Sequence, residues 1–420
     1  MYLLRCIINA CLDVGLGLPM MQILDSEKEQ RIIPVFRLAF RPFFLGASAF
    51  SVISMLLWAL FWSGSVDLSA LMYGNPLWWH SHEMLFGFTG AVIIGFLLTA
   101  VQNWTGNPGV RGWKLASIFM LWLLARIGLL VGTPSTAIMI LDLLWMPLAA
   151  YFLAKPIFIR KQWNNLFFAP LILLLTYLNA RFHMLALGVG EADLRSVSFM
   201  SLIVVSVIVL VVGGRVIPFF TWRGTNTEQI TRVKWIELGA LIPSWLLLAN
   251  VLLPVPATLS EFTLPLLLAA TSIFNLIRFV RWRSFSTLKT PLLWLLHFAY
   301  MFMILGMLLL AVHFQTGDVS YSVALHFITV GGIGCMILAM IARVSLGHTG
   351  RSLQINRVMV AAFVTLMASA LIRTVVVMLF PTLMLDGYIL SAILWAVAFA
   401  IFTVVYYPIL TKSRLDGRPG

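Results

Sequence analysis

Long apolar runs recur along the chain, and short polar connections separate them. Each run has about 18 to 23 residues, the length that an α-helix needs to cross roughly 30 Å of hydrocarbon. The pattern predicts twelve transmembrane helices, at residues 43–63, 82–101, 113–132, 136–154, 166–187, 197–214, 236–253, 262–280, 291–312, 321–343, 358–380 and 388–410. We therefore expect an all-α polytopic protein with one membrane domain over residues 34–420, after an N-terminal cytoplasmic segment over residues 1–33.

Basic residues are concentrated on one side of this predicted topology. Of the 28 Lys and Arg residues, 24 lie in the N-terminal segment, the C-terminal tail and the even-numbered loops, counted with adjoining helix-end residues such as Arg278, whereas the odd-numbered loops contain only Arg195. Because cytoplasmic loops of membrane proteins accumulate Lys and Arg, this distribution predicts an inner-membrane protein with both termini in the cytoplasm. The same loops account for the net charge of +13, so the expected partner is the lipid bilayer and not a nucleic acid.

Composition agrees with a lipid environment. Apolar residues make up 61% of the chain and charged residues only 10%, compared with about 25% charged residues in soluble domains. The three cysteines have no CxxC spacing and predict neither a disulfide framework nor a zinc site. Residues 1–25 leave two interpretations open: a signal-peptide-like run after Arg5 that Asp13 interrupts, or a translation start at Met20 or Met21.

Two segments of 25 residues resemble each other without a gap. One extends from His82 to Gly106 and the other from His326 to Gly350, and glycines recur at equal positions in both. They correspond to predicted helices 2 and 10, and the similar phrase TWRG ends helix 6. Three repeats of four helices would explain this pattern. The alternative is chance similarity between glycine-rich helices, which pack closely through small residues.

Ionisable residues within the predicted helices indicate functional positions, because a charge is costly to bury in a bilayer. Most of them fall in the half of the membrane that faces away from the cytoplasm. The outer group consists of Arg126, Arg181, Arg373, Asp142, Glu83, His82, His183 and His326, with His80 and His313 at the outer rim.

Imidazoles coordinate transition metals, and haem iron takes axial imidazoles. The repeat places His82 and His326 at equivalent positions, so we predict that they are the axial ligands of a b-type haem between helices 2 and 10. Arginine offers permanent positive charge and paired donors for haem propionates. The candidate propionate partners are Arg126, Arg181 and Arg373.

Structural interpretations of the same residues stay open. A histidine in a membrane helix can simply hydrogen-bond a neighbouring helix, and Arg126 with Asp142 is then a structural ion pair. His183, four residues after Asn179, then belongs to a polar packing seam.

His80 has two predicted placements. It lies either on helix 2 or in the loop after Pro76, where it would be free to bind a second metal. The chain has no Walker phosphate loop, no dinucleotide fingerprint and no HExxH motif, so no catalytic residue is predicted.

Several long phrases resemble those of a known family. They are FRLAFRPFFLGA at 36–47, WWHSHEMLFGFTGAVIIGFLLTAVQNWTG at 78–106, GGRVIPFFT at 213–221, RVSLGHTGR at 343–351 and YYPILTKSRLDGRPG at 406–420. With them the chain resembles the NnrS family of bacterial membrane proteins from about residue 34 to the C-terminus. The resemblance implies haem and copper as cofactors, protection against nitric oxide and nitrosative stress, nitric oxide or a related small ligand as partner, and an unidentified electron donor.

The resemblance also carries over individual residues. Besides the histidines His80, His82 and His326, the motif residues, which have no assigned role, are Glu83, Arg215, His348 and Arg351. His348 and Arg351 fall in a predicted cytoplasmic loop, which separates them from an outer site.

Haem-copper oxidases are similar in architecture, with twelve helices in three arcs and a haem held from helices 2 and 10. Their copper site needs histidines on helices 6 and 7, where this sequence has none, so oxygen reduction is not expected. The remaining candidate ligands for copper are His80, His183 and His313.

The sequence thus favours a haem- and copper-binding inner-membrane protein that protects against nitric oxide and nitrosative stress. One alternative is a secondary transporter of a metal or small anion, which twelve helices and buried arginines also suit. Proline-broken helices would favour transport, but the prolines mostly lie at predicted helix ends, as Pro42, Pro76 and Pro291 do. The other alternative is a non-enzymatic regulator of nitrosylated iron pools.

Overall fold

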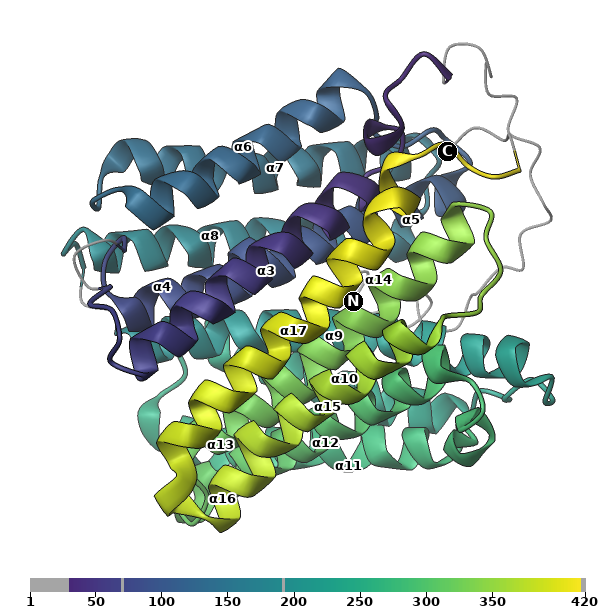
Figure 1. Cartoon of the computed structure of the whole chain (residues 1–420). Coiled ribbons are helices and arrows are strands. Elements are labelled where there is room, and N and C mark those ends of the chain that lie inside the picture. The colour runs from purple at the N-terminus through teal and green to yellow at the C-terminus, as the bar shows by residue number, and fades with distance from the viewer. Residues whose placement is uncertain (1–29, 69–71, 191–192, 417–420) are drawn as a thin grey trace. The chain divides into compact units, whose positions relative to one another are not determined.

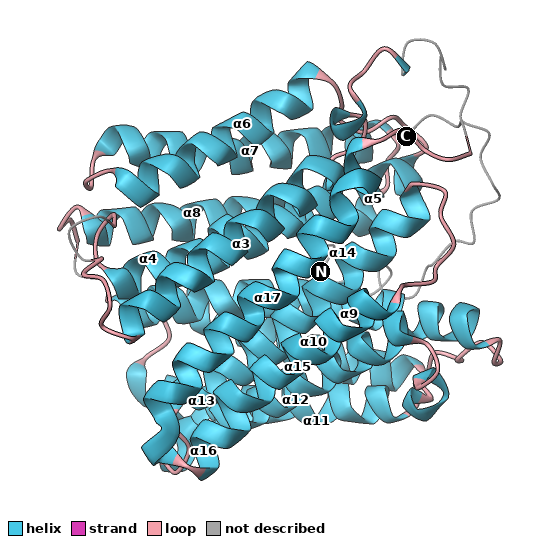
Figure 2. Cartoon of the chain, viewed as in Figure 1, coloured by secondary structure: helices cyan, strands magenta, loops and turns pink. Residues whose placement is uncertain are grey.

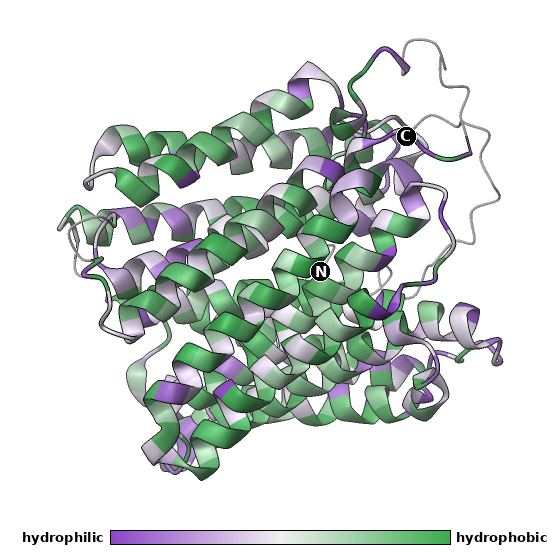
Figure 3. Ribbon diagram, viewed as in Figure 1, coloured by the Kyte–Doolittle hydropathy of each residue, from purple (hydrophilic) through white to green (hydrophobic). Residues whose placement is uncertain are grey.

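The computed structural model describes residues 30–68, 72–190 and 193–416. The two possible starts and most of the predicted segment 1–33 lie outside the described residues. Regular structure in the described part is entirely helical, and twelve helices are long and apolar enough to cross a membrane (Figure 2). Both the all-α class and the number of spans are therefore confirmed. Figure 3 shows mostly hydrophobic helices, with hydrophilic residues in connecting segments and at several helix ends.

Among the described residues the chain forms two compact units. The first contains the chain up to Ser198 together with Ile341–Leu353 and the C-terminal stretch from Phe402, and the second contains Phe199–Met340 and Gln354–Ile401. Three long helices have residues in both units. They are α9 (Leu194–Thr225), α14 (Cys335–His348) and α17 (Met384–Thr411).

The first unit contains five of the membrane spans. They are α3 (Phe40–Trp62), the continuous helix formed by α4 (Pro76–His82), η2 (Glu83–Gly90) and α5 (Ala91–Thr105), and then α6 (Trp113–Val131), α7 (Thr136–Ile159) and α8 (Phe168–Ala186). Helix α7 packs between α6 and α8, α5 packs on α3 and α7, and α4 contacts α8 (Figure 1). The contact between α4 and α8 brings the start of the second span next to a helix about a hundred residues later in the sequence.

The second unit contains four further spans and most of the three spans that the two units share. Its further elements are α10 (Lys234–Leu252), α11 (Ala257–Val280), α12 (Pro291–Thr316), α13 (Tyr321–His326), η5 (Phe327–Gly334), α15 (Arg357–Leu371), η6 (Ile372–Val376) and α16 (Val377–Leu379). Helix α11 packs between α10 and α12, and η5 packs on α12 and α15.

Local sequence explains where these helices start. Asn75 precedes α4, and its side-chain oxygen accepts a hydrogen bond from the Trp78 backbone N–H at 2.9 Å, while Pro76 occupies the first turn. Ser135 caps α7 and Asn356 caps α15 in the same way. These caps satisfy backbone donors that the hydrocarbon region could not.

Several helices extend beyond the predicted apolar runs. Helix 2 begins at Pro76 rather than 82, so His82 lies within the helix, and α9 continues to Thr225 past the predicted end at 214. In helix 2 the added turns contain Trp78 and Trp79, which are buried, and Asn75 caps them, so the helix starts at its cap and not where the apolar run begins. Six prolines lie inside helices that remain helical on both sides: Pro147, Pro156, Pro218, Pro243, Pro265 and Pro408.

The two similar sequence segments adopt the same local distortion. In each, a histidine is followed by eight residues of π-helix, Glu83–Gly90 after His82 and Phe327–Gly334 after His326. Such segments are rare and frequently lie at functional sites. The equal lengths support the correspondence of helices 2 and 10, while the arrangement in three repeats stays a prediction.

Glycines in the second π-helix permit close packing. A Cβ at Gly331 would overlap the ring of Phe302 on α12, and one at Gly334 would overlap the ring of Trp395 on α17. At Gly128 on α6, by contrast, the nearest atoms belong to Ile138 at 3.6 Å, an ordinary contact.

We predict that Gly331→Ala destabilises the protein by about 1–3 kcal/mol, because the added methyl group has no space. Gly128→Ala is the matched control and should be neutral or slightly stabilising, since alanine favours a helix. Thermal unfolding of the purified protein in detergent measures both. Equal unfolding temperatures for the two variants would contradict the close packing of η5 on α12.

Candidate metal centre

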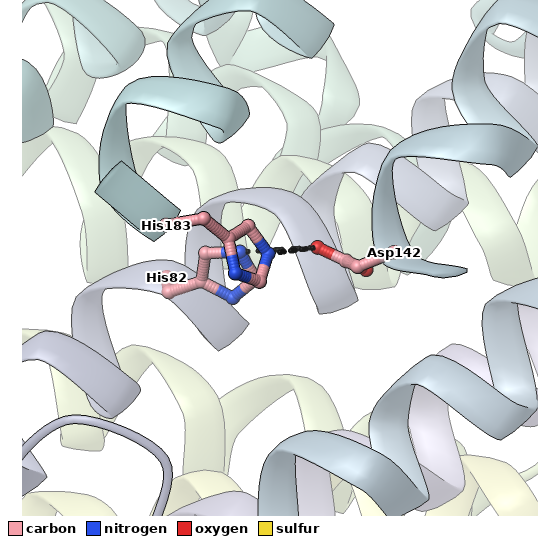
Figure 4. A group of neighbouring side chains, drawn as sticks. All are labelled: His82, Asp142 and His183. Carbon is pink, nitrogen blue, oxygen red and sulfur yellow. Dashed lines mark hydrogen bonds and ion pairs between the residues drawn. The ribbon is translucent and has the colours of Figure 1, made fainter. Parts of the chain in front are cut away.

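The first unit buries a group of polar side chains inside its helices. They come from four spans and have relative exposures of 2% or less. The group consists of His82, Glu83, Arg126, Asp142, Asn179 and His183. Figure 4 shows the two imidazoles and the Asp142 carboxylate facing one another.

An ion-paired arginine holds this group together. Arg126 Nη1 donates to both carboxylate oxygens of Glu83, at 2.9 and 2.8 Å, and Arg126 Nη2 donates to Asp142 Oδ1. Gly87 makes room, because a Cβ there would overlap the guanidinium. The Trp122 indole N–H donates to the Gly87 carbonyl at 2.9 Å, which satisfies a backbone acceptor in the π-helix. The predicted Arg126–Asp142 ion pair therefore exists and includes Glu83.

The imidazoles converge on the other oxygen of Asp142. Nε2 of His82 and Nε2 of His183 each lie 3.2 Å from Asp142 Oδ2. One ligand atom from each of the three residues lies within 4.8 Å of the other two. Asn179 donates to the same oxygen through Nδ2 at 2.8 Å, and its Oδ1 lies 2.7 Å from His82 Nε2.

Each imidazole is oriented by a partner at its second nitrogen. His82 Nδ1 lies 2.8 Å from Glu83 Oε1, and His183 Nδ1 lies 2.9 Å from the Tyr73 hydroxyl. Histidine ligands of metals are typically oriented in this way by a carboxylate or other polar group on the far side. Burial raises the pKa of Tyr73, which lies in a loop outside the spans, so its phenol keeps its proton at neutral pH.

The donor set and the charge both suit a cation. Two imidazole nitrogens and one carboxylate oxygen are common ligands of zinc and non-haem iron, and imidazole also binds copper. With both carboxylates ionised and both imidazoles neutral, Glu83, Asp142 and Arg126 carry one net negative charge. Such a charge inside hydrocarbon is costly unless a cation or a proton balances it.

Three of the predicted site residues lie outside the buried histidine–carboxylate group. Of the two predicted placements of His80, the structure has the helix and not the loop, because Pro76 starts the helix; His80 stacks on Trp58 with ring centroids 4.0 Å apart. Arg181 is half-buried and donates to Tyr177 on its own helix at 3.1 Å, two positions from the residues that face the centre. In the second unit, Nδ1 of His313 lies 2.8 Å from the Val319 carbonyl.

His326 and Arg373 lie together in the second unit. His326 Nδ1 is 2.6 Å from the Ser322 carbonyl, and His326 Nε2 is 3.3 Å from Arg373 Nη2. His82 makes its contacts in the first unit. The axial pair His82 and His326 therefore stays a prediction.

The remaining motif residues are also accounted for. His348 is the last residue of α14 rather than a loop residue, because the helix continues past the predicted end at 343, and its carbonyl accepts from Arg414 at 2.9 Å. Arg351 donates to the Thr349 carbonyl at 3.4 Å. Arg215 is half-buried within α9 in the second unit.

Sequence reasoning missed two contributors to buried polar groups. Tyr73 gave no signal, because it lies in a connecting loop. Arg278 was counted with the cytoplasmic loop, yet it is buried in α11, where it pairs with Glu237 at 3.3 Å and hydrogen-bonds Tyr300. The spacing of Asn275 and Arg278, one helical turn apart, was the available signal.

These features define a polytopic helical membrane protein with a buried histidine–carboxylate centre. A sequence profile described as NnrS protein matches residues 34–414, most of the chain. The chain belongs to the NnrS family, as its motifs indicated. No curated protein matches the sequence.

We predict that Arg126→Gln destabilises the protein by about 3–5 kcal/mol, because it leaves two buried carboxylates without their cation. Arg181→Gln is the matched control and should cost less than about 1 kcal/mol, since its partner is on the surface of the same helix. Thermal unfolding in detergent measures both variants. If Arg126→Gln unfolds at the temperature of Arg181→Gln, the ion pairs do not stabilise the first unit.

Proposed function

We propose that this protein is a metal-binding protein of the bacterial inner membrane that protects cells against nitric oxide and nitrosative stress. The observation that carries the proposal is the convergence of two imidazole Nε2 atoms on one Asp142 oxygen inside the membrane. Membership of the NnrS family supports the link to nitric oxide. The asymmetric Lys and Arg distribution supports cytoplasmic termini, which would place this centre in the outer half of the bilayer.

The metal ligands we propose are His82, Asp142 and His183, with copper as the predicted ion. A bound ion would supply a redox couple or a Lewis acid to a small ligand such as nitric oxide. The protein's own contribution is orientation: Glu83 and Tyr73 hold the imidazoles, and Arg126 occupies the oxygen of Asp142 that does not face them. The dry surroundings exclude competing water.

Haem is the second proposed cofactor. The orientation of His326 supports it, since Nδ1 lies against the Ser322 carbonyl and Nε2, the usual axial nitrogen, faces the guanidinium of Arg373. Arg373 would then turn to a propionate. His82 is the predicted partner ligand. Because it would have to exchange its contacts with Asn179 and Asp142 for the iron, it serves either the haem or the metal ion of the first unit, and the variants below decide which.

We predict that His183→Ala reduces the copper bound per purified chain to background, because two donors hold an ion poorly. Tyr73→Phe should keep the fold and weaken metal binding by about tenfold or more, since it removes only the orienting hydrogen bond. Elemental analysis of the purified protein measures both, and His313→Ala is the control that should retain wild-type metal. Equal metal in His183→Ala and His313→Ala would exclude this centre.

The same variants distinguish protection against nitric oxide from transport of a metal or anion. Cells carrying His183→Ala should survive nitric oxide exposure as poorly as cells lacking the gene, and His313→Ala should restore survival. Metal or anion uptake by proteoliposomes, with wild-type nitric oxide resistance in His183→Ala cells, would favour the transporter instead.

We predict that protein expressed with adequate haem has a haem absorption band, and that His82→Ala and His326→Ala each abolish or alter it. The reason is that loss of an axial imidazole changes the ligand field of the iron. His313→Ala again serves as the control. Two unchanged spectra would refute the axial assignment, and absence of a band in the wild type would refute the haem.

A further inference from the structure

The second unit buries an arginine in a setting unlike that of Arg126. Arg373, on η6, is 7% exposed. Its Nη2 donates to the Ser322 hydroxyl at 2.8 Å and lies 3.3 Å from His326 Nε2. Its guanidinium lies over the ring of Tyr388, 3.8 Å from the centroid. All four residues belong to the second unit.

Arg373 has no carboxylate partner among the described residues. Arg126 pairs with Glu83 and Asp142, and Arg278 pairs with Glu237, but no ion pair within 4 Å includes Arg373. Within the described part of the chain, its Nη1 also has no hydrogen-bond partner. An arginine cannot lose its charge, and a buried cation without a counter-ion is costly.

Comparison of the two similar segments explains the missing carboxylates. When His82 is matched with His326, Glu83 corresponds to Phe327. Asp142 follows Arg126 at nearly the same distance along the chain as Tyr388 follows Arg373. Phe327 thus takes the sequence position of one partner of Arg126, and the ring of Tyr388 lies against the guanidinium of Arg373, which has no carboxylate partner among the described residues.

We propose that Arg373, His326 and Ser322 form a binding site for a small monovalent anion. The anion takes the place of the carboxylates that the first unit supplies from its own chain. The Nη1 donor of Arg373 and the Ser322 hydroxyl hydrogen are the groups that would bind it. Ser322 and His326 are half-buried, whereas Arg373 is 7% exposed. One unbalanced positive charge favours a monovalent ion such as nitrate, nitrite or chloride.

The neutral form of His326 is consistent with this site. If Nδ1 donates to the Ser322 carbonyl, Nε2 carries the lone pair and accepts from Arg373. The imidazole then orients the guanidinium without adding charge. A carboxylate on a bound cofactor shares the chemistry of a free anion, and we commit to the free anion as the occupant when no haem is bound at His326.

The test is thermal unfolding of the full chain in lipid nanodiscs, with sodium nitrate or chloride exchanged for sodium gluconate at constant ionic strength. We expect the unfolding temperature of the wild type to rise saturably with the small anions, relative to Arg373→Gln. Arg373→Gln should weaken the apparent affinity by about tenfold or more. Arg181→Gln is the matched control and should respond as the wild type does.

A second variant keeps the test decisive if Arg373→Gln does not fold. Tyr388→Glu introduces an internal carboxylate beside Arg373, so it should unfold at a temperature that no longer depends on the anion. An anion response that persists in Arg373→Gln or in Tyr388→Glu would overturn the proposal, as would a wild type that responds to none of the anions. The proposed haem would take His326 and Arg373, so the anion response should be present in haem-free protein and lost in haem-loaded protein; a response of equal size in both would overturn the shared site.

Discussion

The arrangement of the buried centre depends on one guanidinium held between two carboxylates. Arg126 binds Glu83 on one side and Asp142 Oδ1 on the other, inside a hydrocarbon environment where none of the three could remain charged alone. Because Oδ1 is occupied, Asp142 can present only Oδ2 to the imidazoles. The geometry of the donor set is thus a consequence of charge pairing, and the two cannot be altered independently.

The same constraint distinguishes the two units. In the first, two acidic residues surround one arginine, which is the basis for the proposed cation. In the second, the ring of Tyr388 lies against Arg373 and no carboxylate among the described residues pairs with it, which is the basis for the proposed anion. If both proposals hold, a similar backbone with a histidine, a π-helix and an arginine from the following span serves ligands of opposite charge, and the neighbouring side chains decide which.

The helices and the identity of the buried charges could be predicted because both depend on local sequence. Apolar runs specify the spans, and a lone Arg126 or Asp142 within such a run must find a partner. The meeting of His183 with His82 could not be predicted, because it requires the packing of α8 against α4 across a long stretch of chain. Arg278 was misplaced because an arginine near a helix end looks the same in sequence whether it reaches water or turns inward.

The π-helices add a constraint that a hydropathy pattern does not contain. One inserted residue rotates the preceding part of a helix by about 100° relative to the following part. His82 lies just before such a segment and Gly87 within it, so the histidine can face α8 while the glycine accommodates the arginine of α6. An uninterrupted α-helix would turn one of them away. The distortion is therefore what allows one span to serve the imidazole cluster and the ion pair together, and its recurrence before Gly334 implies the same geometrical need around His326.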